Sequence, residues 1–592
     1  MSFTTRPEIA GTFGVVASTH WLATAVGMSI LEKGGNAFDA GVAVAFTLQV
    51  VEPHLNGPLG DVPVIVYDKR RGKPEVICGQ GPAPAGATLE HYRDRCGLEL
   101  VPGTGLLAPC IPGSFMALML VLEQYGTMRP RDVLAPAIAY AGNGYPLVPQ
   151  ICDTIERVAD LFRAYWPTSA DVYLPNGSVP APASLFRNRR HAATYARLLE
   201  EAESGGGSRE AEIERARRAW SQGFVAEAVE RYCINTEVMD VSGRRNKGVL
   251  TAQDMANWRP GIEAPLEYDY GRYTVYKPAS WSQSPVLLQQ LAILKQFGLD
   301  RIDPADADFI HLWVETAKLA YADRDAFYGD PKFVDVPMET LLSDAYNGER
   351  AKLVDMTKAS LELRPGSIAG YDGRIIYCDG MGGAGAGAGE PTVGRMGDTK
   401  GDTCHVDVID KQGNMFTATP SGGWLQSSPV IPDLGFPLGT RAQMFWLESD
   451  HPATLAPGKR PRSTLSVGMA SRDGEPYMVW GTPGGDQQDQ WNSQFLLRHI
   501  HAGHNLQQAI DAPAWHIEDV PSSFWPREAS PGLLVVEDRL PAATLRELQR
   551  RGHTLVSSGP WSEGRLSAAA IDGPFLKAAA NARGMQGYAA GR

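Results

Sequence analysis

The sequence predicts an α+β fold, in which helices dominate the first part of the chain and antiparallel strands dominate the last part. Apolar residues recur at helical spacing in Leu22–Lys33 and in the stretch beyond it. A glycine-rich segment, 379–402, then separates this part from Thr403–Ile409, where side chains alternate as in a strand. A turn at 410–414 follows, so Met415–Thr419 is expected to return beside that strand as a hairpin.

The first part opens with two helices and a strand. Gly34 and Gly35 end the first helix, and the side chain of Asn36 can cap the next one. Val62–Tyr67 is apolar and rich in β-branched residues, which is typical of a strand. The period of the apolar residues predicts further helices at Gly113–Tyr125, Pro130–Asn143, Pro285–Phe297 and Asp308–Tyr328.

Two segments have an unusual composition. Glu200–Arg218 is dense in Glu and Arg and contains consecutive glycines, which predicts a solvated helical insertion with a flexible hinge. Segment 379–402 has almost no large apolar side chain. Such a stretch cannot bury enough surface to offset the entropy of ordering it, so we expect a mobile tail that ends just before Thr403.

The strand that begins near Thr403 has two distinct faces. Thr403, His405 and Asp407 share one face, whereas Cys404 lies on the other face beside two valines, so Cys404 is expected in the core. Later strands are expected at Thr464–Ala470, Pro476–Gly481 and Gly532–Val536, and later helices at Trp491–Ala502, Asn505–Ala512 and Pro541–Arg551.

Composition excludes several classes of function. The chain has 592 residues, 43% of them hydrophobic, and a formal net charge of −12, which argues against nucleic acid and anionic membranes as partners. The seven cysteines form no Cys-x-x-Cys pair, which predicts reduced thiols and no zinc ribbon. No signal peptide and no apolar stretch near 20 residues is found, so a soluble cytoplasmic protein is expected.

A threonine at the start of a strand, directly after a floppy segment, can be interpreted in two ways. Its hydroxyl can attack the preceding carbonyl, and the cleaved chain would then carry both a nucleophile and a basic α-amino group on Thr403. That amine has a pKa of about 7.7–8.0, close to cellular pH. The alternative is a long surface loop before an ordinary hairpin, and spacing alone favours this alternative.

Motifs spread along most of the chain resemble those of the gamma-glutamyltransferase family. The run from Asp402 through Thr403 and His405 to Gly413-Asn414 is similar to the start of that family's small subunit. Other stretches that resemble family motifs are Gly34–Ala40, Val51–His54, Ile111–Ser114, Leu134–Ala137, Leu250–Asp254, His311–Pro331, Lys459–Thr464 and Gly481–Gly485. Only residues 151–243 and the last residues match poorly.

The resemblance implies a four-layer αββα Ntn-hydrolase sandwich with two central antiparallel sheets. It implies cleavage between Asp402 and Thr403, giving a large chain 1–402 and a small catalytic chain 403–592 that stay associated. It further implies an amide hydrolase or acyltransferase that needs no cofactor and no metal.

The same resemblance assigns roles to individual residues. Thr403 matches the nucleophile, and Gly484 and Gly485 match the glycines whose N–H groups stabilise the oxyanion. Ser421 matches a hydroxyl residue that hydrogen-bonds the nucleophile. Ser463 and Thr464 match a pair that supports substrate binding. A plain turn for the glycines, and capping or strand-edge bonding for the hydroxyls, are the alternatives.

The residues that would hold a glutamyl group depart from the family pattern. In the family pattern an Arg binds the α-carboxylate, and Gln80 occupies its position here. The family's Asp binds the α-ammonium, and Gln443 stands near the corresponding position. Gly423 replaces a family Asn. A neutral Gln cannot give the charged bidentate grip of Arg, so gamma-glutamyl peptides are expected to be poor substrates. Arg441 either rebuilds a carboxylate clamp or makes a structural ion pair.

This pattern resembles the branch that contains oxamate amidohydrolase, which acts on a small carboxylate-bearing amide. Two alternatives remain: a true gamma-glutamyltransferase or glutathione hydrolase, and an unprocessed binding protein with the same fold. Asp486 or Asp489 is expected to cap the following helix, although their side chains could also contact a polar amide. The nearby His499, His501 and His504 fall on different helical faces, which argues against a metal site.

Overall fold

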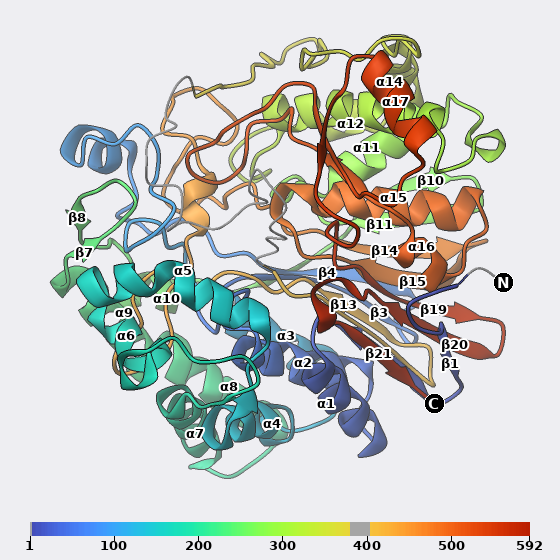
Figure 1. The fold of residues 1–592 in the computed structure, drawn as a ribbon. Helices are drawn as coiled ribbons and strands as arrows, with labels where there is room; N and C mark the ends of the chain where they lie inside the picture. Colours follow the sequence, from blue (N-terminus) through green and yellow to red (C-terminus); the bar gives the residue numbers. More distant parts are fainter. Residues whose placement is uncertain (1–2, 379–402) are drawn as a thin grey trace.

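The computed structural model describes residues 3–378 and 403–592, and in it helices and sheets form four layers (Figure 1). Two antiparallel sheets of seven strands each pack face to face in the middle. Helices cover the outer face of each sheet, so the predicted αββα sandwich is confirmed. The predicted mobile tail and Asp402 belong to 379–402 and lie outside the described residues.

Sheet one and sheet two each combine strands from the beginning and the end of the sequence. Sheet one runs in the order β1 (Ile9–Gly11), β20 (Phe575–Ala580), β19 (Ser567–Asp572), β15 (Glu475–Gly481), β14 (Val467–Arg472), β11 (Tyr273–Lys277) and β10 (Leu266–Tyr270). Sheet two runs in the order β21 (Tyr588–Gly591), β2 (Gly14–Ser18), β12 (Val406–Asp410), β13 (Met415–Ala418), β3 (Val62–Asp68), β4 (Lys73–Gly79) and β9 (Gly261–Glu263).

Three apolar cores hold the layers together. A core between the sheets contains Val15, Ile65, Val479 and Ala569. The outer core of sheet two includes side chains of α1 (Trp21–Glu32), α2 (Ala37–Val51), α3 (Ser114–Tyr125), α4 (Pro130–Asn143), α7 (Arg189–Glu203), α8 (Arg209–Ser221) and α9 (Phe224–Asn235). The outer core of sheet one includes side chains of α11 (Pro285–Leu294), α12 (Ala307–Phe327), α15 (Gln488–His501), α16 (Leu506–Asp511) and α17 (Ala542–Arg550).

Local sequence signals place several elements as predicted. Asn36 accepts hydrogen bonds from the backbone N–H groups of Phe38 and Asp39, which caps α2. The predicted hairpin of β12 and β13 forms, and its register places Val406 opposite Ala418. Cys404 is buried in the core between sheet two and its helices, as the alternation predicted.

The predicted solvated insertion at 200–218 is wrong in one respect. The segment is helical, but α8 buries Ile213 and Ala216 in the same core as α2. Trp220, at the end of α8, stacks on Phe115 of α3 with ring centroids 4.3 Å apart. The many charges therefore occupy only the outer face of a helix whose inner face packs on α3 and α4.

Two further expectations can be compared with the structure. Among residues 3–378 and 403–592, no helix combines the length and the apolar character that crossing a membrane requires. All seven cysteines lie in the described part of the chain, and none joins another in a disulfide, as expected for reduced thiols.

Candidate active site

Thr403 lies three residues before β12, a central strand of sheet two that pairs with β2 and β13. Its side chain is buried, and its Oγ1 donates a hydrogen bond to Ser421 Oγ at 3.2 Å. The backbones of the two residues also form an antiparallel β-bridge. The structure therefore brings together the two hydroxyl residues that the sequence predicted as nucleophile and partner.

Ser421 is held from its other side by Asp61. The N–H of Asp61 donates to the carbonyl of Ser421 at 2.8 Å, and the N–H of Ser421 donates back at 3.0 Å. The Asp61 carboxylate accepts two bonds from Arg441, from Nε at 2.7 Å and from Nη2 at 3.0 Å. Burial raises the pKa of the Asp61 carboxyl, and the charge of Arg441 opposes this shift.

The Asp61 contact bears on the two alternatives for Arg441. Its guanidinium makes the buried bidentate ion pair that one alternative predicted. Gly422 also belongs to this arrangement, because a Cβ there would lie 2.9 Å from Asp61 Oδ1, and its φ is +76°. A charged pair thus supports the loop that carries Ser421.

Gly484 and Gly485 follow β15 and have φ values of +131° and +53°. Only glycine adopts these values readily, and a Cβ on Gly484 would lie 2.2 Å from the ring of Trp491. Gly481, at the end of β15, packs so closely on His405 that a Cβ there would lie 2.3 Å from the imidazole. The glycine loop therefore follows a strand end that packs on His405, two residues after Thr403.

Ser463 and Thr464 are fully buried near the same loop. The carbonyl of Ser463 accepts a hydrogen bond from the N–H of Gln283 at 2.7 Å. The side chain of Gln283 then donates to the carbonyl of Gly485 at 3.2 Å. Gln283 thus connects the two motifs, a role that sequence reasoning missed. Its signal in the sequence was a polar residue two positions before the buried helix α11.

The two glutamines of the altered glutamyl clamp have different surroundings. Gln443 lies in the same 3-10 turn as Arg441; its Nε2 donates to Thr440 Oγ1 at 3.0 Å, and its Oε1 accepts from the N–H of Trp525 at 3.1 Å. Gln80 is buried, and among the described residues its side chain donates to the adjacent carbonyl of Gly81, at 3.0 Å. Hydrogen bonds connect Gln443, but not Gln80, to the neighbourhood of Arg441.

The predicted capping of α15 by Asp486 or Asp489 is wrong, since this helix begins without a side-chain cap. Asp486 instead contacts Arg324 Nη1 at 2.7 Å and Ser523 Oγ at 2.6 Å. Although burial opposes ionisation, Arg324 lowers the pKa of Asp486. Asp489 pairs with Lys277 at 3.0 Å, so both carboxylates are neutralised by buried cations that are distant in sequence.

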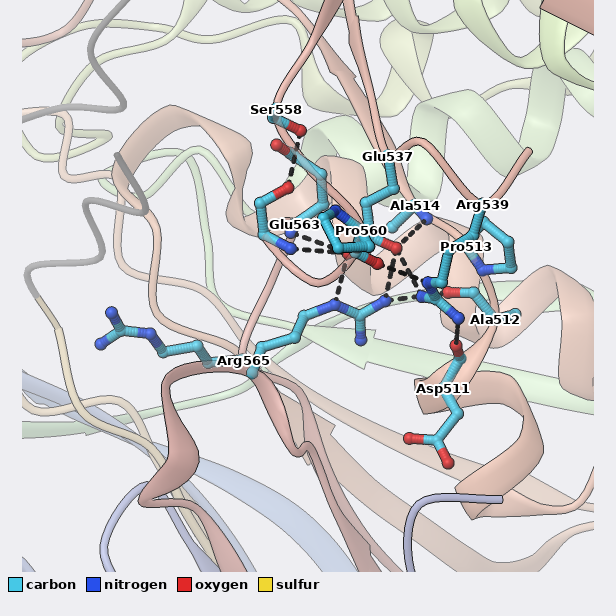
Figure 2. A network of polar contacts seen from close by, with 12 residues as sticks. Asp511, Ala512, Pro513, Ala514, Glu537, Arg539, Ser558, Pro560, Glu563 and Arg565 are labelled. Carbon is cyan, nitrogen blue, oxygen red and sulfur yellow. Dashed lines mark hydrogen bonds and ion pairs between the residues drawn. The ribbon is translucent and has the colours of Figure 1, made fainter. Parts of the chain in front are cut away.

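A polar cluster holds the turn before β19 (Figure 2). Buried Glu537 binds Arg583 through both carboxylate oxygens and accepts the N–H of Glu563 at 3.0 Å. Two residues later, the N–H of Arg565 donates to Thr482 Oγ1 at 3.0 Å. Figure 2 shows the side chain of Arg565 pointing away from Glu537, so the cluster anchors the turn before β19 through its backbone.

We expect the stability of the protein to fall at alkaline pH because of His516. Burial disfavours its charge, yet Glu563 at 2.5 Å and Glu518 raise the pKa of His516 to about 9. A folded-state pKa above the ordinary 6.5 contributes about 3 kcal/mol that is fully present below pH 6.5 and is lost as pH rises through 9.

Thermal unfolding at a series of pH values measures this contribution. His516→Gln should lower the unfolding midpoint at pH 6.5 and flatten its decrease between pH 6.5 and 9.5. An equal decrease in the variant and the wild type would contradict the assignment. The ring of His516 packs at 5.9 Å on Trp491, which contacts Gly484, so activity is expected to follow stability.

Histidines near the C-terminal helices have protein partners. His499 bonds the hydroxyl of Tyr477 at 2.7 Å, and His501 contacts Asp300 at 2.5 Å. Elsewhere His311, Glu315 and His553 lie close enough to share a cation. Lys318 Nζ is 3.0 Å from Glu315, however, so an ammonium already neutralises this carboxylate.

The αββα sandwich with a buried threonine before a central strand is the arrangement of an Ntn hydrolase. The family model for gamma-glutamyltranspeptidase matches residues 23–591, and the chain belongs to this family. It is therefore an amide hydrolase or acyltransferase of that family.

Relatives of several activities match almost the whole chain. The glutathione hydrolase-like YwrD proenzyme of Bacillus subtilis is 30% identical, with 98% of each chain covered. The oxamate amidohydrolase proenzyme of Klebsiella pneumoniae is 29% identical, with 95% of this chain and 94% of the relative covered. Among solved structures, LmbA2991HD is 52% identical with a TM-score of 0.93 and full coverage of both chains. The cephalosporin acylase of Bacillus halodurans is 26% identical with a TM-score of 0.83, covering 100% of this chain and 98% of that one.

Proposed function

We propose that the protein is an autoprocessed N-terminal-threonine amidohydrolase. The Thr403 hydroxyl attacks the carbonyl of Asp402, and water opens the resulting ester to give chains 1–402 and 403–592. The freed α-amino group then takes the hydroxyl proton as Thr403 attacks an amide substrate. The amine leaves with a proton, and water hydrolyses the acyl-enzyme. The observation that carries this proposal is the buried Thr403–Ser421 pair.

The remaining residues have supporting roles in this mechanism. The N–H groups of Gly484 and Gly485 stabilise the oxyanion, and removing one such donor typically costs about 10²–10³ in rate. Ser421 orients the nucleophile. The mechanism uses no metal and no cofactor, and the absence of disulfides supports a reducing compartment such as the cytoplasm.

We propose a small acyl amide as the substrate rather than a gamma-glutamyl peptide. The neutral Gln80 and Gln443 support this choice, because neither can neutralise a charged group of a glutamyl zwitterion. A related oxamate amidohydrolase and a related cephalosporin acylase also support it. The alternative, gamma-glutamyl transfer or glutathione hydrolysis, is favoured by the relatives named glutathione hydrolase.

A substrate panel tests this proposal. The purified enzyme is assayed with gamma-glutamyl 4-nitroanilide and with short-chain acyl 4-nitroanilides, each compared with Thr403→Ala. We expect Thr403-dependent hydrolysis of an acyl anilide and at least tenfold lower kcat/KM for the gamma-glutamyl compound. Efficient gamma-glutamyl turnover would support the alternative. Processed enzyme without Thr403-dependent hydrolysis of any compound, or a chain that stays uncut, would support a binding protein instead.

A further inference from the structure

Two buried arginines near the glycine loop have donor groups that no atom of the described residues accepts. Arg462 and Arg527 are only 3% and 2% exposed. Arg462 Nη2 donates to Ser523 Oγ at 3.0 Å, but its Nη1 is buried without a hydrogen-bond partner. Arg527 Nη2 donates to the carbonyls of Gln443 and Phe445, but its Nε is also buried without a partner.

The charges around these arginines do not balance. Arg324 accompanies them, and the carboxylates facing the group are Asp325 and Asp486. Both carboxylates lie closer to Arg324, at 2.9 and 2.7 Å, than Asp325 lies to Arg462, at 3.5 Å. Within residues 3–378 and 403–592, three guanidinium groups therefore face two carboxylates, which leaves one excess positive charge out of contact with water.

Electrostatics agree with this count. Burial lowers the pKa of Arg462 to about 10, and the neighbouring Arg324 adds to the effect. Burial lowers the pKa of Arg527 to about 9, and Arg462 is the largest charged contributor. A guanidinium keeps its usual pKa when an anion accompanies it, so both side chains would be stabilised by one more carboxylate.

The two arginines lie next to three parts of the candidate active site: the Ser463–Thr464 pair, Gln443 and the residue after Gly485. Arg462 directly precedes Ser463 and Thr464, and no described residue hydrogen-bonds the buried hydroxyl of Thr464. Arg527 holds the backbone of Gln443, the residue near the lost ammonium site. Ser523, the partner of Arg462, also binds Asp486, which follows Gly485.

We propose that Arg462 and Arg527 form a carboxylate-binding site for the substrate, with the donors Arg462 Nη1 and Arg527 Nε. This inference rests on the proposed function and specifies its substrate class. A carboxylate at the far end of the acyl group would supply the missing negative charge. Because Gln443 provides no negative partner for an ammonium, the preferred acyl group carries no amino group, as in the half-amides of short dicarboxylic acids.

Paired substrates test the site and locate the carboxylate. One set consists of 4-nitroanilides of succinic and glutaric acid, matched with butanoyl and pentanoyl 4-nitroanilides. A butanoyl amide of 5-amino-2-nitrobenzoate carries the carboxylate on the leaving group instead. We expect wild-type kcat/KM to be at least tenfold higher for a dicarboxylic half-anilide than for its neutral match, with no gain for the aminobenzoate amide.

Substitutions connect that preference to the arginines. Arg462→Met should lower kcat/KM for the half-anilide about tenfold to hundredfold, as expected for lost charged hydrogen bonds, and change the neutral anilide less than about threefold. Arg462→Lys should retain part of the preference. Arg498→Met, which removes another buried arginine bonded to the carbonyl of Pro513, serves as the matched control and should keep the preference.

Calorimetric titration with glutarate tests the site without catalysis. We expect binding to the wild type and at least tenfold weaker binding to Arg462→Met and Arg527→Met. If Thr403-dependent hydrolysis shows no carboxylate preference, or if preference resides in the aminobenzoate, this inference fails while the proposed function stands. If glutarate binds through Arg462 but no amide is hydrolysed, the proposed function fails alone. If the Met variants do not fold, the Arg462→Lys variant and the wild-type substrate comparisons still test the carboxylate site.

Discussion

Thr403→Ala is expected to leave a single full-length chain and to abolish amide hydrolysis. The substitution removes the hydroxyl that would attack the carbonyl of Asp402, so neither the cut nor the free α-amino group forms. Nucleophile and base are therefore lost together, and the turnover number should fall by at least about 10⁴. Denaturing gel electrophoresis with N-terminal sequencing measures the cut, and the anilide assay measures turnover.

Two control variants identify the group responsible. Thr403→Ser keeps a hydroxyl and should still yield a chain that begins at residue 403. Cys404→Ala removes the adjacent thiol, whose pKa burial raises well above its usual value, so it should process normally. If Thr403→Ala is still cleaved, or if a folded Cys404→Ala variant is not cleaved, then a group other than the Thr403 hydroxyl makes the cut.

Removing Asp61 is expected to destabilise the protein by about 3–5 kcal/mol, because Arg441 would remain as a buried, unpaired charge. Asp61→Ala and Arg441→Met should each lower the midpoint of urea unfolding. The double variant should lose less than the sum of the two single losses, by about 1–3 kcal/mol. Activity should fall in all three variants, since Asp61 pairs with the backbone of Ser421.

The exposed pair of Arg272 and Asp473 provides a matched comparison. Both side chains are largely exposed and pair across a strand end, so Asp473→Ala should leave urea unfolding unchanged within error. If Arg441→Met unfolds like the wild type but raises KM for carboxylate substrates, then Arg441 acts as a substrate clamp and its pairing with Asp61 contributes little to stability.

Local signals predicted the parts of the fold that depend on neighbours in sequence. The bounds of α4 came out as Pro130–Asn143 because proline favours the first turn and Gly144 adopts a positive φ at the end. The two faces of β12 followed from alternation alone. The start of β14 was not predicted correctly: the expected strand began at Thr464, whereas strand pairing begins only at Val467.

Sequence reasoning failed where a partner lies far away in the chain. The prediction that Asp486 caps α15 used only neighbouring residues. Its carboxylate instead pairs with Arg324, which is 162 positions away in the sequence. Arg441 finds Asp61 across 380 positions, which no local pattern reveals. The resemblance supplied Ser421, Gly484 and Gly485, whereas Gln283 and Arg324, which support them through contacts between layers, emerged only from the structure.

The order of strands has a consequence for the two chains that a cut before Thr403 would create. The later chain would contribute β21, β12 and β13 to sheet two, and β2, from the earlier chain, lies between β21 and β12. Separating the halves would require breaking backbone pairing inside both sheets. Dilution would therefore not dissociate the two chains, and two processed molecules would not exchange their small chains. The uncut chain refolds in a unimolecular reaction, whereas the two denatured chains would first have to meet in solution. The uncut precursor is therefore expected to refold more readily than the processed protein.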